Sequence, residues 1–555
     1  MNELVSLFQK VKTGERVRLE NKVYHAYQDD CFYLTGYYCS NTASYAENPN
    51  GERFTAIYLK DVNNVEIDGN GATLIIHGKM TPFVFDNCKN ITLKNLTIDY
   101  ARPTMSEFTV TKVEGNAGYI HVNDEYLYEI VDGVLYWVGE KDLSGQRYWR
   151  HAYRTDDMKV FSMQQTLENN YNYFCPSEEG KRPSVPAYKT IEVIDKNTLK
   201  LIYEDECPLV VNATYQTRYL PRDQIGGFAE RCENVVYDNL TIYAMHGFGV
   251  LSQYCDNVTV KNIRAIPKKG RTITSNADFF QFSGCKGKVL IEDCVMSAGH
   301  DDFINLHGTY LQITDYIAKE NALQVEFKHT ESWGFLPFCK GDKIEFICAE
   351  TMLLKEENTV VGIEKLSPFI FKVYLQNKPK MEVVIGDVVE NVTWTPSLTV
   401  NNCHFYESMA HGILCTTRGQ VRIEDCVFDK LGYEAIAIAG ETKFWFESGK
   451  ITDVLVRNCV FKDVGYGPSR KKWLQFSVKP FAKQYVDGKY FHGVLTLENN
   501  RFEILGDQDD FLLRNIERVV FKNNIFSRKP RFVCEHVGEI VGDVEYESIK
   551  NEGEK

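Results

Sequence analysis

Two adjacent carboxylates, Asp301 and Asp302, interrupt the otherwise apolar and strand-like run AGHDDFINLHG at residues 298–308. Two like charges are costly to bury side by side, and neighbouring carboxylates split their pKa values, so one can stay protonated while the other stays ionised. A third carboxylate, Asp278, precedes them by 23 and 24 residues. Such a group predicts general acid–base chemistry of the kind that hydrolyses glycosidic bonds.

The alternatives for this acidic group are weaker. A DD pair is common in solvated turns, but Phe303, Ile304 and Leu306 place this one in packed structure. The flanking His300 and His307 are of a type that is more often structural than catalytic. The sequence has no HExxH or CxxC zinc spacing, no nucleophile signature and no glycine-rich phosphate loop. The carboxylates could instead hold Ca²⁺, as in calcium-dependent β-helix lyases, and this alternative stays open.

An internal repeat would position these residues. In ten segments, positions two and four are mostly apolar, position six is nearly always Asn or Asp, and positions seven and nine are usually apolar. The segments are NVEIDGNGAT (64–73), NITLKNLTID (90–99), NVVYDNLTIY (234–243), NVTVKNIRAI (257–266), KVLIEDCVMS (288–297), SLTVNNCHFY (397–406), QVRIEDCVFD (420–429), DVLVRNCVFK (453–462), VLTLENNRFE (494–503) and RVVFKNNIFS (518–527). Alternation on both sides of a polar corner describes two short strands joined by a bend.

The period of this repeat predicts an all-β, right-handed parallel β-helix with one coil per repeat. Several neighbouring segments are spaced by only 23 to 26 residues, and the Leu-rich consensus and helices of a leucine-rich solenoid are missing. Asn at position six tolerates the left-handed conformation of a bend and can hydrogen-bond to its equivalent in the next coil. One coil rises about 4.8 Å, so Asp278, Asp301 and Asp302 are expected on one face of the solenoid.

The cysteines follow the same register. Cys294, Cys403, Cys426 and Cys459 each come directly after an Asn or Asp of the repeat. A shared place in successive coils indicates buried thiols that pack inside the stack rather than disulfide partners.

Two stretches without the repeat divide the chain. Both are rich in alternating segments, which predicts two small β-barrel-like insertions growing from turns of the solenoid. The expected organisation is N-terminal coils at 1–104, a first insertion at 105–225, coils with the carboxylates at 226–308, a second insertion at 309–396, C-terminal coils at 397–535 and a tail at 536–555.

The charge balance limits the partners. With 63 basic and 76 acidic residues the net charge is −13, which disfavours nucleic acid or an anionic membrane as the main partner. No signal peptide or membrane span is visible, so we expect a cytoplasmic protein, or a secreted or periplasmic one if a leader has been removed. Solenoid edges and exposed insertions could support a homodimer.

A sugar pocket needs aromatic rings that stack on the apolar face of a hexose and polar groups that bind its hydroxyls. Residues of these types occur near the carboxylates in sequence or one coil away, and others occur in the second insertion and the C-terminal coils. We predict the substrate-binding residues to be Arg271, Asn305, His307, His246, Trp333, Trp445 and Glu447.

The run SNADFFQFSGCKGKVLIEDCVMSAGHDDFINLHGTYL resembles the catalytic core of glycoside hydrolase family 110, the bacterial α-1,3-galactosidases that remove terminal galactose from blood group B-type and related glycans. Four other stretches agree, and the resemblance spans nearly the whole chain: HGKMTPFVF (77–85), NLTIDYARPTMSE (95–107), WGFLPFCKGDKIEF (333–346) and FWFESGKITDV (444–454).

The resemblance implies an inverting exo-hydrolase on a β-helix with inserted barrels, with no metal or organic cofactor. Asp278, Asp301 and Asp302 fall on the family's three catalytic-site carboxylates, without showing which is the acid. The chain departs from typical members because it lacks a visible signal peptide, which leaves the compartment open.

Two other classes remain on the same fold. Polygalacturonases have a similarly spaced acidic triplet, but they act on an anionic substrate and need well-placed cations. Lys268, Lys269 and Arg271 precede Asp278 and keep that alternative open, as Ca²⁺ does for a pectate-lyase-like enzyme. The other class is a carbohydrate-binding β-helix without catalysis, which would not require three carboxylates one coil apart.

Overall fold

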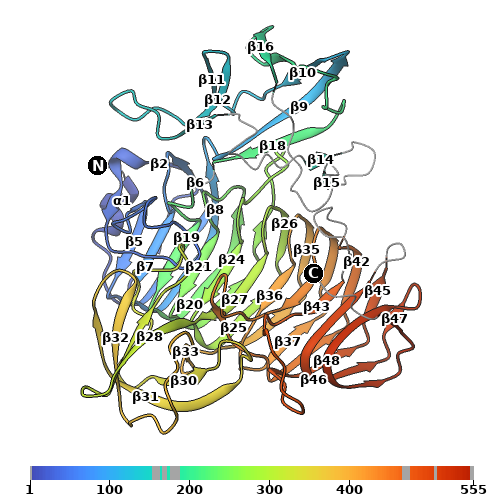
Figure 1. Ribbon diagram of the computed structural model, residues 1–555. Coiled ribbons are helices and arrows are strands. Elements are labelled where there is room, and N and C mark those ends of the chain that lie inside the picture. Colours follow the sequence, from blue (N-terminus) through green and yellow to red (C-terminus); the bar gives the residue numbers. More distant parts are fainter. Residues whose placement is uncertain are drawn as a thin grey trace.

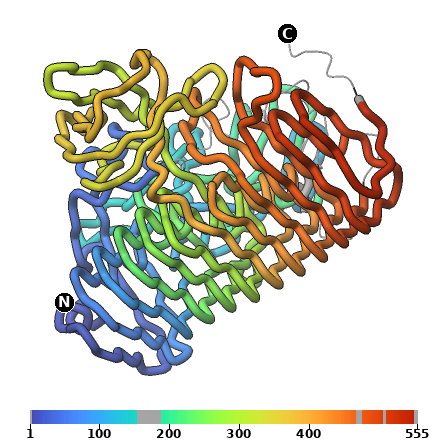
Figure 2. Tube along the Cα trace, turned by 90° about the horizontal axis from the view of Figure 1, so that it is seen from below, coloured from blue at the N-terminus to red at the C-terminus, as the bar shows by residue number. Residues whose placement is uncertain are grey.

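The computed structural model describes residues 3–152, 163–165, 172–174, 188–219, 221–465, 475–504 and 509–549. Its body is a parallel β-helix in which the coils follow one another in chain order, as the repeat predicts (Figure 1). Figure 2 shows the stacked coils from the N-terminal to the C-terminal end. Helix α1 (Glu3–Phe8) packs Leu4 and Phe8 onto the N-terminal end of the core.

Three parallel sheets line the coils. The first sheet is formed by β6 (Asn63–His77), β8 (Lys89–Tyr100), β20 (Glu233–Ile242), β22 (Asp256–Lys261), β25 (Lys286–Glu292), β34 (Ser397–Asn401), β37 (Val421–Glu424), β41 (Asp453–Arg457), β44 (His492–Glu498) and β46 (Phe511–Lys522). The second sheet follows the bend and is formed by β23 (Arg264–Ala265), β26 (Val295–Gly299), β35 (His404–Ser408), β38 (Val427–Leu431), β42 (Val460–Val464), β45 (Arg501–Glu503) and β47 (Ile525–Phe526). The long strands β6, β8 and β20 run through the bend into this second sheet.

The third sheet closes each coil, and Asp278 and Asp302 lie just before two of its strands. It is formed by β5 (Ile57–Lys60), β7 (Phe83–Asp86), β19 (Gly227–Glu230), β21 (Val250–Gln253), β24 (Phe280–Ser283), β27 (Ile304–Thr309), β36 (Ile413–Cys415), β39 (Ile436–Ile438) and β43 (Phe476–Val478). The stack begins with β1 (Arg16–Arg18) and β2 (Val23–Tyr27) against β6, and it ends with β48 (Arg531–Gly542) and β49 (Glu547–Ile549). Strand β48 runs across residue 536, where a tail was expected to start, and β49 lies beyond it. Residues 550–555 lie outside the described residues.

The predicted asparagine ladder at the bend is present. Position six has a positive φ, for example 53° at Asn239 and 56° at Asn458. The side chains bond along the stack: Asn239 Nδ2 donates to Asn95 Oδ1 at 2.8 Å, and Asn458 Nδ2 donates to Asp425 Oδ1 at 3.1 Å. Because the left-handed conformation is cheapest for Gly, Asn and Asp, this residue type fixes the bend in every coil.

A second asparagine ladder, which we did not predict from the sequence, lies at position one of the repeat. Asn90 donates to Asn64 at 2.7 Å, Asn234 to Asn90 at 2.8 Å and Asn257 to Asn234 at 3.1 Å. These four residues also have positive φ values. The four coils that contain these residues therefore turn at asparagine corners before the first sheet as well.

The interior of the stack is apolar. The thiols of the four repeat cysteines are buried and free, as predicted. Phenylalanines at position nine stack on one another in successive coils, with centroid distances of 5.4, 5.1 and 4.5 Å between Phe405, Phe428, Phe461 and Phe502. Offset stacking of this kind adds to the area burial that stabilises the core.

The first insertion leaves the solenoid after β8 and lies above the coils in Figure 1. It has a core of its own around Trp137 and Tyr215. Within the described residues its main sheet is open, with β16 and β18 at the edges. The strands are β9 (Met105–Glu114), β10 (Ala117–His121), β16 (Thr190–Val193), β17 (Thr198–Ile202) and β18 (Thr214–Arg218) in the main sheet, with β11 (Tyr128–Val131), β12 (Val134–Val138), β13 (Arg150–Ala152), β14 (Met163–Gln165) and β15 (Asn172–Phe174) beside it.

The second insertion leaves after β27 and forms a closed six-stranded barrel, as predicted. Its core includes Trp333, Phe335 and Phe371. Its strands, in their order around the barrel, are β28 (Leu311–Ile317), β29 (Ala322–Glu326), β32 (Ile370–Leu375), β31 (Leu354–Lys365), β30 (Lys343–Ile347) and β33 (Val388–Asn391). In the described part of the chain, no helix has the length and apolar character that a membrane crossing needs.

Candidate active site

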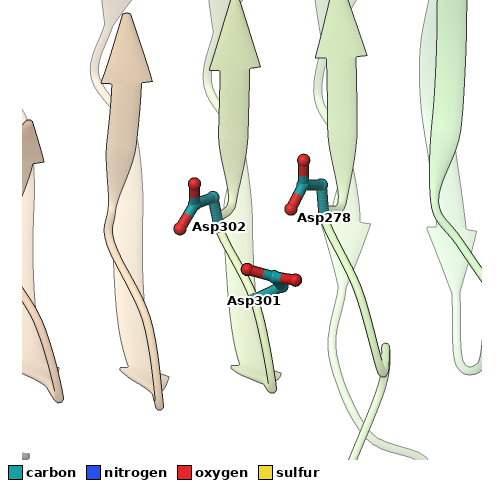
Figure 3. Close-up of side chains that lie close together, drawn as sticks. All are labelled: Asp278, Asp301 and Asp302. Atoms are coloured by element: carbon teal, nitrogen blue, oxygen red, sulfur yellow. The ribbon is translucent and has the colours of Figure 1, made fainter. Parts of the chain in front are cut away.

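The three carboxylates gather where the second sheet gives way to the third. Strands β24 and β27 pair with Phe280 opposite Ile304, which puts Asp278 and Asp302 side by side two residues before each strand. Asp301 lies in the turn just before Asp302 (Figure 3). Each carboxylate has an oxygen within 4.8 Å of an oxygen of the other two. The structure therefore brings the three predicted residues together on one face, one coil apart.

They open onto a pocket of about 160 Å³. The lining comes from distant parts of the chain, because loops from the N-terminal region, the exit of the first insertion and the C-terminal coils all converge on it. The lining residues are Asn41, Arg222, Asp278, Asp301, Asp302, Asn305, Ala410, His411, Leu414, Tyr433, Trp445 and Glu447. Four of the predicted substrate-binding or catalytic positions beyond the DD pair are thus in the pocket: Asp278, Asn305, Trp445 and Glu447.

Asp278 has the environment of an acid. Its residue is 5% exposed, and Asn305 Nδ2 donates to its Oδ2 at 3.0 Å. Burial first, and then the carboxylates of Asp301 and Asp302, raise the pKa of Asp278 well above its ordinary value, against a smaller opposing effect of Arg222. Removal from water disfavours a charged carboxylate and neighbouring negative charge adds to this. Asp278 therefore holds a proton under conditions in which an exposed aspartate has lost it.

Asp301 is the most accessible of the three, with 33% of its side chain exposed. Arg222 Nη2 lies 3.3 Å from its Oδ2, and Arg222 Nη1 donates to the backbone oxygen of Asn41 at 3.1 Å. Burial and the adjacent Asp302 raise the pKa of Asp301, while Arg222 opposes the rise. The guanidinium thus places a positive charge beside the carboxylate cluster.

Asp302 is held by one neighbouring residue. Its Oδ1 accepts the backbone N–H of His411 at 3.0 Å and pairs with Nδ1 of the same residue at 2.8 Å. His411 in turn contacts Glu434, with 3.2 Å between Nε2 and Oε2. Burial lowers the pKa of His411, but Asp302 and Glu434 outweigh this effect and raise it above its ordinary value.

Glu447 and Trp445, two of the predicted substrate-binding residues, also line the pocket. Glu447 Oε1 accepts from Asn41 Nδ2 at 2.8 Å and lies 3.6 Å from Nε2 of His307. The predicted residue His307 is buried beside Glu447 and does not line the pocket. The ring of Trp445 is 41% exposed at the rim and packs on His329, with 4.2 Å between centroids. A half-exposed indole backed by a second ring is a platform for the apolar face of a sugar.

The structure places Arg271 outside the pocket. Its guanidinium is buried between two carboxylates, with Nη1 2.6 Å from Asp99 Oδ1 and Nη2 2.7 Å from Glu125 Oε2. Lys268 Nζ also pairs with Asp99, at 2.9 Å. These cations tie the first insertion to the coils, and they are not directed at the carboxylate cluster.

Two further predicted residues also lie outside the lining. His246 is buried with Nε2 3.1 Å from Asp223 Oδ1, in a network that includes Lys79. Trp333 is 3% exposed in the barrel core, and its Nε1 donates to the backbone oxygen of Ala43 at 2.9 Å. That bond braces the loop that carries Asn41 into the pocket, so Trp333 supports the site indirectly.

Asn41, Arg222, His411 and Tyr433 line the pocket but were not identified from the sequence. One of them had a detectable signal: His411 precedes its third-sheet strand by two residues, as Asp302 does, and an alignment of that part of the coil would have found it. Asn41 and Arg222 reach the site through long loops, for which spacing offers no guide.

The fold and the site together define the class of protein. This is a β-helix protein with a half-open pocket lined by three carboxylates, an arrangement that suits the cleavage of glycosidic bonds. Known families agree: the profile described as right-handed β-helix region matches residues 388–529, which gives the hand of the solenoid, and the profile described as GLAA-B β-barrel domain II matches residues 322–389.

Several similar proteins share one printed name, α-1,3-galactosidase. An α-1,3-galactosidase A of Bacteroides fragilis is 31% identical over 504 residues, covering 89% of this chain and 79% of that protein. An α-1,3-galactosidase A of Akkermansia muciniphila is 34% identical over 75% of this chain and 67% of that protein. An α-1,3-galactosidase B of Bacteroides thetaiotaomicron is 30% identical over 90% of this chain and 78% of that protein. The chain belongs to the α-1,3-galactosidase family.

A solved structure of a family 28 exopolygalacturonase from Yersinia enterocolitica is similar only at a TM-score of 0.33 and 10% identity, over 98% of this chain and 75% of that one. A likeness of this size carries no argument about the site.

Proposed function

We propose that this protein is an exo-acting, inverting glycoside hydrolase that removes terminal α-1,3-linked galactose from blood group B-type or linear α-galactosyl glycans. One observation carries the proposal: three carboxylates from neighbouring coils meet in a pocket, where burial favours the protonated form of Asp278, in a chain whose relatives are named α-1,3-galactosidases.

Asp278 is the acid in this mechanism. Its raised pKa favours the protonated carboxyl group, and transfer of that proton to the glycosidic oxygen makes the leaving sugar a neutral alcohol. Asn305 fixes the carboxyl group through Oδ2, which leaves Oδ1 for the substrate. Asp302, oriented by two N–H groups of His411, is the base that takes a proton from water, and Asp301 with Arg222 completes the polar wall.

The carboxylate spacing suits a bound water. A water that donates two hydrogen bonds of about 2.8 Å spans about 4.4 Å between its acceptors, and the nearest oxygens of the carboxylates lie within 4.8 Å. This nearest-oxygen distance is not the separation between carboxyl groups that distinguishes an inverting from a retaining enzyme. Support for inversion therefore comes from the family resemblance.

The pocket supports exo-action on a neutral sugar. Its volume of about 160 Å³ is below the roughly 300–1,000 Å³ typical of pockets for drug-sized ligands, so it fits one terminal ring better than a chain. Arg222 is the one Lys or Arg among the lining residues, and it is already paired with Asp301. An oligogalacturonide would need cations for its carboxylates, and Lys268 and Arg271 are bound to Asp99 instead.

A substrate comparison tests the proposal. The protein is incubated with a fucosylated B-type oligosaccharide, a linear α-galactosyl-lactose and an oligogalacturonide, and the released sugars are identified by chromatography. We expect free galactose from one or both of the first two and nothing from the third. Galacturonic acid would identify a polygalacturonase, unsaturated products a lyase, and no release from any glycan a binding protein.

A further inference from the structure

A loop at residues 37–44 lies on the outer face of the third sheet and carries Asn41 into the pocket. Ser40 is fully buried and is held by two strands of that sheet. Its N–H donates to Gln253 Oε1 of β21 at 2.9 Å, and Gln281 Nε2 of β24 donates to its Oγ at 3.2 Å. Asn41 itself is 4% exposed and has a φ of 56°, a left-handed conformation that asparagine adopts more readily than most residues. The loop therefore holds Asn41 at a defined place.

The side-chain amide of Asn41 is bound by three neighbours. Nδ2 donates to Glu447 Oε1 at 2.8 Å and lies 3.3 Å from Nε2 of His307, while Oδ1 accepts from Ser332 Oγ at 2.6 Å. Nδ1 of His307 is 2.7 Å from the backbone oxygen of Gly308, which only accepts, so a neutral His307 carries its proton on Nδ1 and accepts at Nε2. Both amide hydrogens of Asn41 are then used within the protein, and neither is left for a sugar.

Glu447 is held through both its backbone and its side chain. Its strand β40 (Glu447–Ser448) pairs with β27, with Glu447 opposite Thr309. Asn41 binds the side chain at Oε1, because a carboxylate oxygen accepts and the amide nitrogen is the donor that faces it. Among the residues that the structure describes, none donates to the other oxygen, Oε2, which is accessible where the side chain lines the pocket. Oε2 is therefore the oxygen that a sugar hydroxyl can reach.

The backbone of Asn41 holds a different group. Its oxygen accepts from Arg222 Nη1 at 3.1 Å, and Nη2 of the same guanidinium lies 3.3 Å from Asp301 Oδ2. Its N–H donates to Ser332 Oγ at 3.2 Å. A substitution that removes only the side chain of Asn41 therefore leaves the backbone bond to Arg222 in place beside the carboxylates. The role of the amide can be measured apart from that of the loop.

Resting on the proposed hydrolase, we propose that Asn41 is a positioning residue, whose side-chain amide fixes Glu447 so that Oε2 accepts a hydrogen bond from a hydroxyl of the terminal galactose. An acceptor that is already oriented loses little conformational freedom when the sugar binds, so more of the bond appears as affinity. This bond is made in the bound substrate as well as in the transition state. Loss of such an interaction raises KM and leaves kcat little changed.

Asn41→Gly is the direct test, because glycine accepts a φ of 56° and keeps both backbone bonds. On α-galactosyl fluoride, whose only sugar is the galactosyl ring, KM should rise about tenfold while kcat falls less than about threefold. The dissociation constant of galactose, measured by titration calorimetry, should rise by a similar factor. The matched control is Asn402→Gly, which removes one ladder bond to Asp293 at a φ of 51°, outside the pocket lining, and should change neither quantity. An unchanged KM and dissociation constant in Asn41→Gly would overturn the proposal.

A double-variant cycle tests whether Asn41 acts through Glu447. Glu447→Ala should weaken galactose binding at least as much as Asn41→Gly, and combining the two should cause no further loss. Losses that multiply would mean that the amide acts on its own, which contradicts the proposal.

Ser332→Ala gives a second route to the same result, because Ser332 is buried, lies outside the pocket lining and donates to Asn41 Oδ1. It should raise KM about two- to threefold, and only while Glu447 is present. An unchanged KM in Ser332→Ala, or the same rise in the Glu447→Ala background, would contradict the positioning role.

The outcomes separate this inference from the function beneath it. If the unsubstituted protein neither releases nor binds galactose, the proposed hydrolase fails and the role of Asn41 fails with it. If galactose is released and Asn41→Gly keeps its KM, the hydrolase stands and the role of Asn41 alone falls. If Asn41→Gly does not fold, as thermal unfolding would show, Ser332→Ala with and without Glu447→Ala decides the matter.

Discussion

Replacing Asp278 with Asn separates acid catalysis from the rest of the mechanism. The amide oxygen can still accept the bond from Asn305 Nδ2, so the pocket keeps its shape. Because burial and neighbouring carboxylates favour the protonated form of Asp278, the substitution exchanges that neutral group for a neutral amide and removes the transferable proton. The charge seen by Asp301 and Asp302 is then nearly unchanged.

The expected magnitude depends on the leaving group. General acid catalysis contributes about 10²–10⁴-fold for a poor leaving group such as a sugar hydroxyl, which corresponds to about 2.7–5.4 kcal/mol of transition-state stabilisation. Fluoride leaves without protonation. Asp278→Asn should therefore lose at least about 10²-fold in kcat on an α-galactosyl oligosaccharide and less than about tenfold on α-galactosyl fluoride.

The pH profile gives an independent readout with a definite sign. An acid works while protonated, so activity on the oligosaccharide should fall as pH rises through the raised pKa of Asp278. On α-galactosyl fluoride this basic limb should be absent in Asp278→Asn. The matched control is Asp256→Asn, which removes a surface carboxylate 3.5 Å from Lys286 and should change neither substrate's rate.

Equal losses on both substrates would refute the assignment of Asp278 as the acid. A selective loss on the oligosaccharide in Asp302→Asn instead would exchange the two roles. A retained rate on both substrates in Asp278→Asn would move the chemistry away from this cluster altogether.

Three further predictions follow from the same geometry. Proton NMR of the first-formed galactose should show the β-anomer from an α-linked substrate, and initial α-galactose would indicate a covalent intermediate. Trp445→Ala should lower kcat/KM about tenfold through lost stacking, on both oligosaccharide and fluoride; a loss on the oligosaccharide alone would place the ring on the leaving sugar. Asn458→Leu should lower the free energy of unfolding by about 1–3 kcal/mol, because it loses the bond to Asp425 and because Leu, without the short polar side chain of Asn, tolerates φ 56° less well. Asn458→Gly, which accepts that φ, should cost less in the same denaturant titration, and equal costs would contradict the backbone argument.

The solenoid was predictable because its physics is local and repeated. A bend that needs a positive φ selects Asn or Asp in every coil, and an interior that needs apolar groups selects positions two, four, seven and nine. Ten repetitions make such a pattern visible where one would not be. The first insertion has no repetition, and its alternating segments are compatible with both a barrel and the open sheet that the described residues form.

The carboxylates were predictable for the same reason, since a separation of about one coil places side chains next to one another whatever the insertions do. Arg271 shows the limit of that argument. It lies close to Asp278 in sequence, but the first insertion brings Asp99 and Glu125 to it, and a buried guanidinium pairs with the nearest carboxylates. Contacts between insertions and loops do not recur at a fixed spacing in the sequence. They therefore cannot be predicted from the repeat.

The division of the pocket between solenoid and loops has a functional consequence. Asp278, Asp302 and His411 stand at equivalent places in rigid coils, so their separations follow from the sheet spacing and change little when loops change. Asn41 and Trp445 reach the pocket on excursions between strands. Loops tolerate substitution and insertion better than the elements that they connect. Variation among relatives should therefore alter which glycan branch is accepted through the loops, while acid and base stay one coil apart.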